Sequence, residues 1–150
     1  GCVMIERIKK LIIENDMCVL ATCHQGRPHC SLMAYVADEK GATIYMATRK
    51  ETNKYKYLVE NPQVSLLIDT RSEKGPEQRA EVQALTVAGT CTPIAEPAQA
   101  DLIRRQIVAH HPHLKALAEH PDAAIIGVRL ESFLLLDGAL KAQHATLHDL

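Results

Sequence analysis

Three strand-like runs that follow one another across short turns constrain the fold of this chain most strongly. Apolar residues dominate the runs at positions 18–24, 29–37 and 42–48. Only the turn residues Gln25 to Pro28 and Asp38 to Gly41 separate the runs, so no helix fits between them. We therefore expect residues 18–48 to form an antiparallel meander. A doubly wound parallel sheet needs helices between most of its strands and is set aside.

The rest of the chain adds further strands with helices at intervals. Apolar residues recur at helical spacing over residues 5–14, and the cap-type residue Thr52 begins a short helix that ends before Asn61. Pro97 begins another helix, which ends at the His-rich segment 110–113. A short helix is expected over 114–119, strands over 63–69, 84–94, 123–130 and 133–137, and a polar loop over 70–83, while 138–150 carries no clear pattern. Six or seven short strands with inserted helices predict a single, mainly β domain: a small antiparallel barrel with peripheral helices.

The composition excludes several functional classes. The chain has 150 residues and a formal net charge of −1, so it has no broad positive electrostatic field that would attract DNA or an anionic membrane. It has four Tyr, one Phe and no Trp, which are too few aromatic side chains to stack on the bases of a nucleic acid. No apolar run approaches the roughly 18 residues that span a bilayer. The five cysteines form no Cys-x-x-Cys pair, so we expect them to be reduced thiols. We therefore expect a cytoplasmic protein, with no nucleic-acid or membrane partner.

A local basic cluster lies where the third strand ends and the following helix begins. Residues 48–56 carry four cations against one glutamate in a chain that is otherwise near neutral. Helix N-termini favour anions because their first backbone N–H groups have no partner within the helix. The hydroxyls of Thr48 and Thr52 and the ammonium of Lys54 can converge with those N–H groups on one phosphate. A solvated basic turn is the alternative interpretation of this segment.

The motifs around this cluster carry a family resemblance that covers most of residues 17–95. They are Leu20-Ala-Thr22, Gly26-Arg-Pro28, Ser31-Leu-Met33, Ile44-Tyr-Met-Ala-Thr48, Thr52-Asn-Lys54, Leu58 and Asn61-Pro-Gln-Val-Ser-Leu66. In this order and spacing they resemble the FMN-binding split-barrel family related to pyridoxamine 5′-phosphate oxidase. The resemblance implies a split β-barrel that forms a homodimer with FMN bound at the interface.

The same resemblance implies the residues that hold the cofactor. Lys54, with Thr52 and Asn53, matches the phosphate site, and Thr48 and Ala47 match the lining of the phosphate and ribityl chain. Asn53 stands where the oxidase usually has Arg, and Arg49 is the residue that can substitute. Ser31, Leu32 and Met33 match the strand whose backbone edges the isoalloxazine ring, and Gln83 is a candidate contact from the partner subunit.

Two functional hypotheses remain open at this stage. The first is an FMN-dependent oxidoreductase that acts on an unidentified small molecule or electron donor, with the cofactor carrying the chemistry and no acid or base residue named. Residues 123–150 lack the Arg- and His-bearing motif that the oxidase uses for its substrate phosphate. The second hypothesis is a non-catalytic module that binds flavin, deazaflavin or haem. His110, His111 and His113 are interpreted as a helix end and not as metal ligands, so no metal site is expected.

Overall fold

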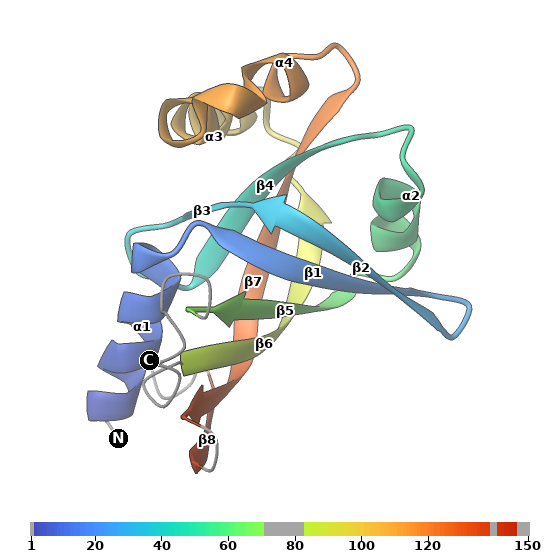
Figure 1. Cartoon of the computed structure of the whole chain (residues 1–150). Helices are drawn as coiled ribbons and strands as arrows, with labels where there is room; N and C mark the ends of the chain where they lie inside the picture. The colour runs from blue at the N-terminus through green and yellow to red at the C-terminus, as the bar shows by residue number, and fades with distance from the viewer. Residues whose placement is uncertain (1, 71–82, 139–140, 147–150) are drawn as a thin grey trace.

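One curled antiparallel sheet dominates the computed structural model, which describes residues 2–70, 83–138 and 141–146 (Figure 1). Its strands are β1 Met17–His24, β2 Arg27–Ala34, β3 Val36–Ala37, β4 Thr43–Arg49, β5 Gln63–Asp69, β6 Gln83–Pro93, β7 Ala123–Asp137 and β8 Lys141–Thr146. The strands lie in the order β2-β1-β5-β6-β7-β4-β3, and β8 pairs with the distal half of β7. The expected mainly β split barrel with peripheral helices is confirmed, with eight strands in the described residues instead of six or seven.

The expected meander is confirmed for its first two strands and only in part for its third. Val36 and Ala37, at the end of the expected second strand, pair as β3 with Tyr45 and Ile44 of β4, whereas β2 itself does not pair with β4. β4 pairs along its whole length with β7, and β2 lies at the other end of the sheet order. The chain passes from β2 to the short β3 through Tyr35, which therefore links the two ends of the sheet. The Tyr35 side chain is buried, its hydroxyl donates to the carbonyl of Ile12 at 2.7 Å, and its backbone N–H donates to Asp16 O at 2.8 Å. The chain thus crosses from one end of the sheet order to the other at a residue held by α1 and by the segment before β1.

The hairpin between β1 and β2 is tighter than the sequence predicts. His24 pairs with Arg27, so only Gln25 and Gly26 form the turn, and both have positive φ, 51° and 77°. This is the type I′ geometry that matches the twist of two antiparallel strands. β2 therefore begins at Arg27, two residues earlier than expected. It includes Pro28, which an edge strand tolerates because it need not donate a hydrogen bond on its open side.

β7 is one strand where the sequence predicts two. The register against β6 shifts between Ala88 and Gly89, which face Ser132 and Leu130, so Glu131 is the extra residue of a β-bulge. The bulge changes which residues face inward: Ile126, Val128 and Leu130 before it, then Phe133 and Leu135 after it. That shift in alternation is the reason the sequence pattern breaks at this point.

Four α-helices lie around the sheet: α1 Cys2–Glu14, α2 Asn53–Glu60, α3 Pro97–His110 and α4 Lys115–Ala118, the last preceded by a 3-10 turn, Pro112–Leu114. Figure 1 shows α1 and α2 at opposite sides of the barrel, and α3 and α4 together over a third side. In the part of the chain that the structure describes, no helix has the length and apolar character that a membrane crossing requires. The predicted loop over 70–83 falls largely on residues 71–82, outside the described residues.

β4 separates two apolar clusters. Ile44 and Met46 face the barrel interior with the inward side chains of β1, β5, β6 and β7. Ala47 faces the other way and packs with Ile103 and Ile107 of α3. The end of β4 is therefore held from both faces, and this positions the segment that leads into α2.

Candidate functional site

Thr52 fixes the corner between β4 and α2, as the sequence predicts. It has extended backbone angles, its hydroxyl oxygen accepts from the N–H of Tyr55 at 3.2 Å, and the same hydroxyl donates to the Arg49 carbonyl at 2.8 Å. The N–H groups of Asn53 and Lys54 precede the first N–H with a partner in the helix, and no hydrogen bond among the described residues uses them. The corner therefore presents backbone donors at a helix N-terminus, where an anion is favoured.

Lys54 connects the two halves of the expected cofactor site. Its side chain is half-buried, and its Nζ donates to Met33 Sδ at 3.1 Å. Burial lowers the pKa of the Lys54 ammonium, and no ion pair joins Lys54 to a carboxylate among the described residues. A thioether is only a weak acceptor for an ammonium group. The Lys54 ammonium is therefore a partly desolvated cation beside β2, the strand that the family resemblance sets against an isoalloxazine ring. A bound anion would stabilise this cation.

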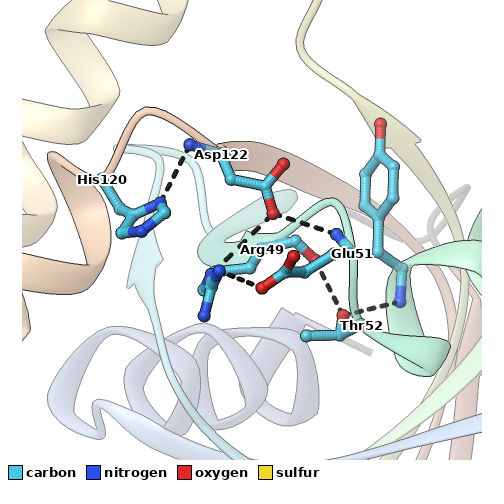
Figure 2. Close-up of polar contacts among 6 residues, drawn as sticks. Arg49, Glu51, Thr52, His120 and Asp122 are labelled. Carbon is cyan, nitrogen blue, oxygen red and sulfur yellow. Dashed lines mark hydrogen bonds and ion pairs between the residues drawn. The ribbon is translucent and has the colours of Figure 1, made fainter.

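Arg49 lies in a different environment, which Figure 2 shows. Its guanidinium pairs with Glu51, and its Nε lies 3.8 Å from Asp122 Oδ2 without a hydrogen bond of its own. The Arg49 charge is thus largely met by carboxylates. For Arg49 to bind a phosphate, as the sequence analysis suggests, its guanidinium must first leave Glu51.

Asp122 supports this corner, and the sequence analysis did not identify it. Its carboxylate accepts from the Glu51 N–H at 3.1 Å, and its backbone carbonyl accepts from the Lys50 N–H at 2.9 Å. The His120 ring nitrogen Nδ1 in turn accepts from the Asp122 N–H at 2.9 Å (Figure 2). Glu51 and Asp122 are 71 positions apart in the chain. No local pattern marks the pair, so sequence alone gave no signal for it.

The remaining predicted residues fall into two groups. Thr48 is buried on the same side of β4 as Met46, and Ser31 faces inward with Met33 on β2, so these residues share the interior side with Lys54. Leu32, Ala47 and Gln83 lie elsewhere within one chain. The Ala47 side chain packs beneath α3, and Gln83 begins β6 in a hollow lined by α1, across the barrel from α2 (Figure 1).

Two histidines attach α2 to the β1–β2 hairpin. The ring of Tyr57 stacks on His24 at 4.1 Å between ring centroids and makes a tilted contact with His29 at 4.8 Å. His24 Nδ1 also lies 2.9 Å from a Glu60 carboxylate oxygen. Both rings thus have an aromatic partner on α2, which places imidazoles next to the candidate site.

The outward face of the sheet carries several exposed apolar side chains. Leu32 is 71% exposed, and Met17, Leu67 and Leu136 are 37–40% exposed. Val19 of β1 pairs with both Leu32 and Leu67, and the same row continues through Thr86 to Leu134. We call this set, Met17, Val19, Leu32, Leu67, Leu134 and Leu136, the outer patch. Thr86 interrupts this row between Leu67 and Leu134, and exposed apolar side chains gathered on one face are a feature that favours an interaction site.

Comparison with known proteins identifies the family. The model of the family described as pyridoxamine 5′-phosphate oxidase matches residues 4–137, nearly the whole chain. The chain belongs to the pyridoxamine 5′-phosphate oxidase family. It is also similar to general stress protein 26 of Bacillus subtilis, with 43% identity over 63 residues. That match covers 42% of this chain and 44% of the stress protein, so the chain aligns with less than half of the length of this relative.

Solved structures share the fold at low sequence identity. A heme binding protein from Mycobacterium smegmatis superposes with a TM-score of 0.80 and 17% identity, over 94% of this chain and 57% of that one. A FAD-binding protein from Mesorhizobium loti superposes with a TM-score of 0.71 and 18% identity, over 87% and 91% of the two chains. These two proteins, which share the fold, are thus named for different planar cofactors.

Proposed function

We propose that this chain is an FMN-binding flavoprotein and an oxidoreductase that acts on a small molecule. The observation that carries the proposal is Lys54: a half-buried ammonium whose partner is the Met33 thioether, at the N-terminus of a capped helix. A phosphomonoester fits this position because it brings two negative charges and several acceptor oxygens to a cation that no described carboxylate neutralises.

In this proposal, different residues of the corner contact the phosphate, the ribityl chain and the ring of FMN. Lys54 binds the phosphate with the N–H groups of Asn53 and Lys54, and Thr52, whose hydroxyl hydrogen is donated to the Arg49 carbonyl, holds the cap of the helix beside it. Thr48 borders the phosphate and ribityl chain from β4, and the β2 segment of Ser31 to Met33 edges the ring through its backbone. When bound, FMN supplies hydride or electron transfer, and the chain binds it, orients it and excludes water from one side.

A second copy of the chain supplies the opposite wall in this proposal. The barrel interior is filled by its own side chains, so a flat ring lies against its outside. Leu32 belongs to the outer patch, and the next residue, Met33, contacts Lys54. Leu32 and Met33 point to opposite faces of β2, but β2 is the edge strand, so a partner that covers the patch can reach past this edge to the phosphate corner. Gln83 of each copy is then a candidate contact to the other copy's cofactor. We accordingly propose a homodimer with FMN at its interface.

The described thiols agree with action in the cytoplasm, which we include in the proposal. Cys18, Cys23, Cys30 and Cys91 are all free, and Cys18 and Cys91 are buried, while Cys30 is exposed. Free thiols of this kind persist in a reducing compartment.

Haem is the competing ligand, and a specific observation supports considering it. Imidazoles are common axial ligands of haem iron, and His24 and His29 lie next to the corner through their contacts with Tyr57. The phosphate corner argues for FMN, since haem carries carboxylates and no phosphate.

The test is a titration of purified, ligand-free protein with FMN and, separately, with haemin, followed by absorption spectra and size-exclusion chromatography. The proposal predicts saturable binding of one FMN per chain by a dimer. A monomer that leaves FMN unbound, or a haemin complex with no FMN binding, contradicts it. Reduction of the bound flavin by NAD(P)H in stopped flow then separates an oxidoreductase from a non-catalytic flavin module.

A further inference from the structure

A cluster of two histidines and an aspartate lies away from the proposed flavin corner, between α3 and the α1–β1 connection. Ligand atoms of Asp16, His110 and His111 all lie within 4.8 Å of one another. His110 is the last residue of α3, His111 is its C-cap, and Asp16 directly precedes β1. The three residues come from chain segments almost a hundred positions apart, so no local sequence pattern groups them.

The orientation of His111 sets this cluster apart from an ordinary helix end. The residue is only 4% exposed, and its Nε2 lies 2.9 Å from the Tyr35 carbonyl oxygen. Because a carbonyl can only accept, Nε2 carries the hydrogen, and Nδ1 of the neutral ring keeps a free lone pair. An imidazole whose second nitrogen donates to a backbone carbonyl is the usual arrangement of a metal-ligating histidine.

The backbone of the same residue, Tyr35, also holds Asp16. The Tyr35 N–H donates to the Asp16 carbonyl at 2.8 Å, so the Tyr35 backbone fixes the segments of both Asp16 and His111. His110 Nε2 lies 3.4 Å from Asp16 Oδ2. The side chains of His110 and Asp16 are 57% and 49% exposed, so both can rotate toward one ion. Zinc binds nitrogen and oxygen at about 2.0–2.2 Å, which requires only a small closure of the cluster.

Two hollows adjoin His110. One, of about 380 Å³, is lined by Ile13, Asn15 and the segment Tyr35 to Glu39, and the other, of about 560 Å³, lies between β3 and α3. An ion held by three protein ligands at this point would keep a coordination position open to water from these hollows.

We propose that Asp16, His110 and His111 form a site for a divalent first-row transition metal, with Zn²⁺ as its preferred probe. Imidazole and carboxylate ligands suit such ions, and Zn²⁺ imposes little geometric preference of its own. His111 binds through Nδ1, and Asp16 and His110 close over the ion. The site links the end of α3 to the beginning of β1, and it does not depend on flavin binding at α2.

The test uses the tag-free chain stripped of metal with a chelator, because a polyhistidine tag would bind the probe. Isothermal titration with Zn²⁺ measures stoichiometry and affinity for the wild type, Asp16→Asn and His110→Gln. His113→Gln is the matched control: His113 is exposed and is not one of the three ligands, and its ring meets the edge of the His111 ring at 5.9 Å, so this variant shows what a change beside His111 does by itself. We leave His111 unchanged because its hydrogen bond to Tyr35 is part of the fold.

The expected result is one Zn²⁺ per chain, an affinity at least about tenfold lower in Asp16→Asn and His110→Gln, and no comparable loss in His113→Gln. A Co²⁺ complex should lack the charge-transfer absorption of a thiolate ligand. Wild-type affinity in both cluster variants, an equal loss in His113→Gln, or a thiolate band from the cysteines would each overturn the proposal.

Discussion

Lys54 is the residue on which the flavin assignment depends, and its surroundings separate ligand binding from folding. The ammonium contacts the Met33 thioether and no described carboxylate, so it adds little to the stability of the ligand-free chain. Lys54→Ala should weaken FMN binding by about 1.5–3 kcal/mol, roughly ten- to a hundredfold, because a charge-assisted contact is lost. It should leave the melting temperature of the ligand-free protein almost unchanged.

The control for this change is Lys56→Ala, which removes an exposed lysine from the same helix. Fluorescence titration with FMN and thermal unfolding of the ligand-free proteins give both quantities. Equal affinity losses in the two variants, or a large drop in melting temperature for Lys54→Ala alone, would show that Lys54 has a structural role instead.

The lowered pKa of Lys54 also predicts a pH dependence with a definite sign. Between the lowered folded value and the unfolded value of 10.5, the unfolded chain binds more protons at this residue than the folded chain does. The stability of the ligand-free protein therefore gains from Lys54 as pH rises through that window. FMN affinity should fall over the same window, because the neutral amine no longer attracts the phosphate. Titrations at a series of pH values check this, and a pH profile identical in wild type and Lys54→Ala would contradict it.

At the residue scale, sequence reasoning found those site members that local pattern marks. Thr52 was readable as a helix cap and Lys54 as a cation just inside the helix. The contact between Lys54 and Met33, and the pairing of Arg49 with Glu51 and Asp122, depend on tertiary structure. A count of charges treats all four cations of residues 48–56 alike. In the structure, carboxylates neutralise Arg49, whereas Lys54 has no ion pair among the described residues.

At the scale of elements, one substitution at Thr52, the N-cap of α2, should remove FMN binding and still keep the helix. Aspartate is as good an N-cap as threonine and interacts favourably with the helix dipole, but its charge repels a phosphate at the same place. Thr52→Asp should lose at least about tenfold in FMN affinity with little loss of stability. Thr52→Ala should cost about 1 kcal/mol of stability, because the Tyr55 N–H loses its acceptor.

Thr52→Ser, which keeps both hydrogen bonds of the hydroxyl, is the control for this pair. Urea unfolding and FMN titration of the three variants separate the cap from the ligand contact. If Thr52→Asp binds FMN as well as Thr52→Ser does, the phosphate does not lie at this helix N-terminus.

The β-bulge between β6 and β7 makes a second prediction at this scale. A Cβ atom at Gly89 would lie 2.6 Å from the Arg129 carbonyl oxygen and 2.8 Å from Val128 Cγ1. Because the first of these atoms belongs to the backbone, it cannot move away without disturbing the strand pair. Gly89→Ala should destabilise the protein by about 1–3 kcal/mol in urea unfolding. Ala88→Ser, at the exposed neighbouring position, should have little effect, and equal stability of both variants would argue against the close approach.

Elements with an uninterrupted local pattern were predictable, and those shaped by their partners were not. β5 follows the predicted bounds, 63–69, because its alternation and flanking residues are self-contained. β7 was divided in two because Glu131 shifts its alternation, and β8 was missed because its weak pattern acquires order by pairing with the end of β7. The pairing of β4 with β7 joins segments about eighty residues apart, which no local pattern specifies.

At the scale of the whole molecule, the outer patch predicts that assembly and flavin binding are lost together. Leu32 is 71% exposed in one chain, so a charge there should cost little in a monomer. In a dimer that covers the patch, Leu32→Asp buries an unpaired carboxylate, and such a change is strongly unfavourable. Leu32→Asp should therefore give a folded monomer with much weaker FMN binding.

Leu102→Asp is the matched control, since Leu102 is an exposed leucine on α3, away from the patch. Size-exclusion chromatography with light scattering and FMN titration of both variants provide the readout. A Leu32→Asp variant that remains dimeric and binds FMN as the wild type does would place the interface elsewhere on the molecule.

The most direct test of the central claim compares FMN with riboflavin, which differ only in the phosphate, on the wild type and Lys54→Ala. If Lys54 binds the phosphate, the wild type should bind FMN far more tightly than riboflavin. Lys54→Ala should then remove most of that difference and change riboflavin affinity little. Equal affinity of the wild type for both compounds, or a preference for FMN that survives in Lys54→Ala, would contradict a phosphate site at the corner between β4 and α2.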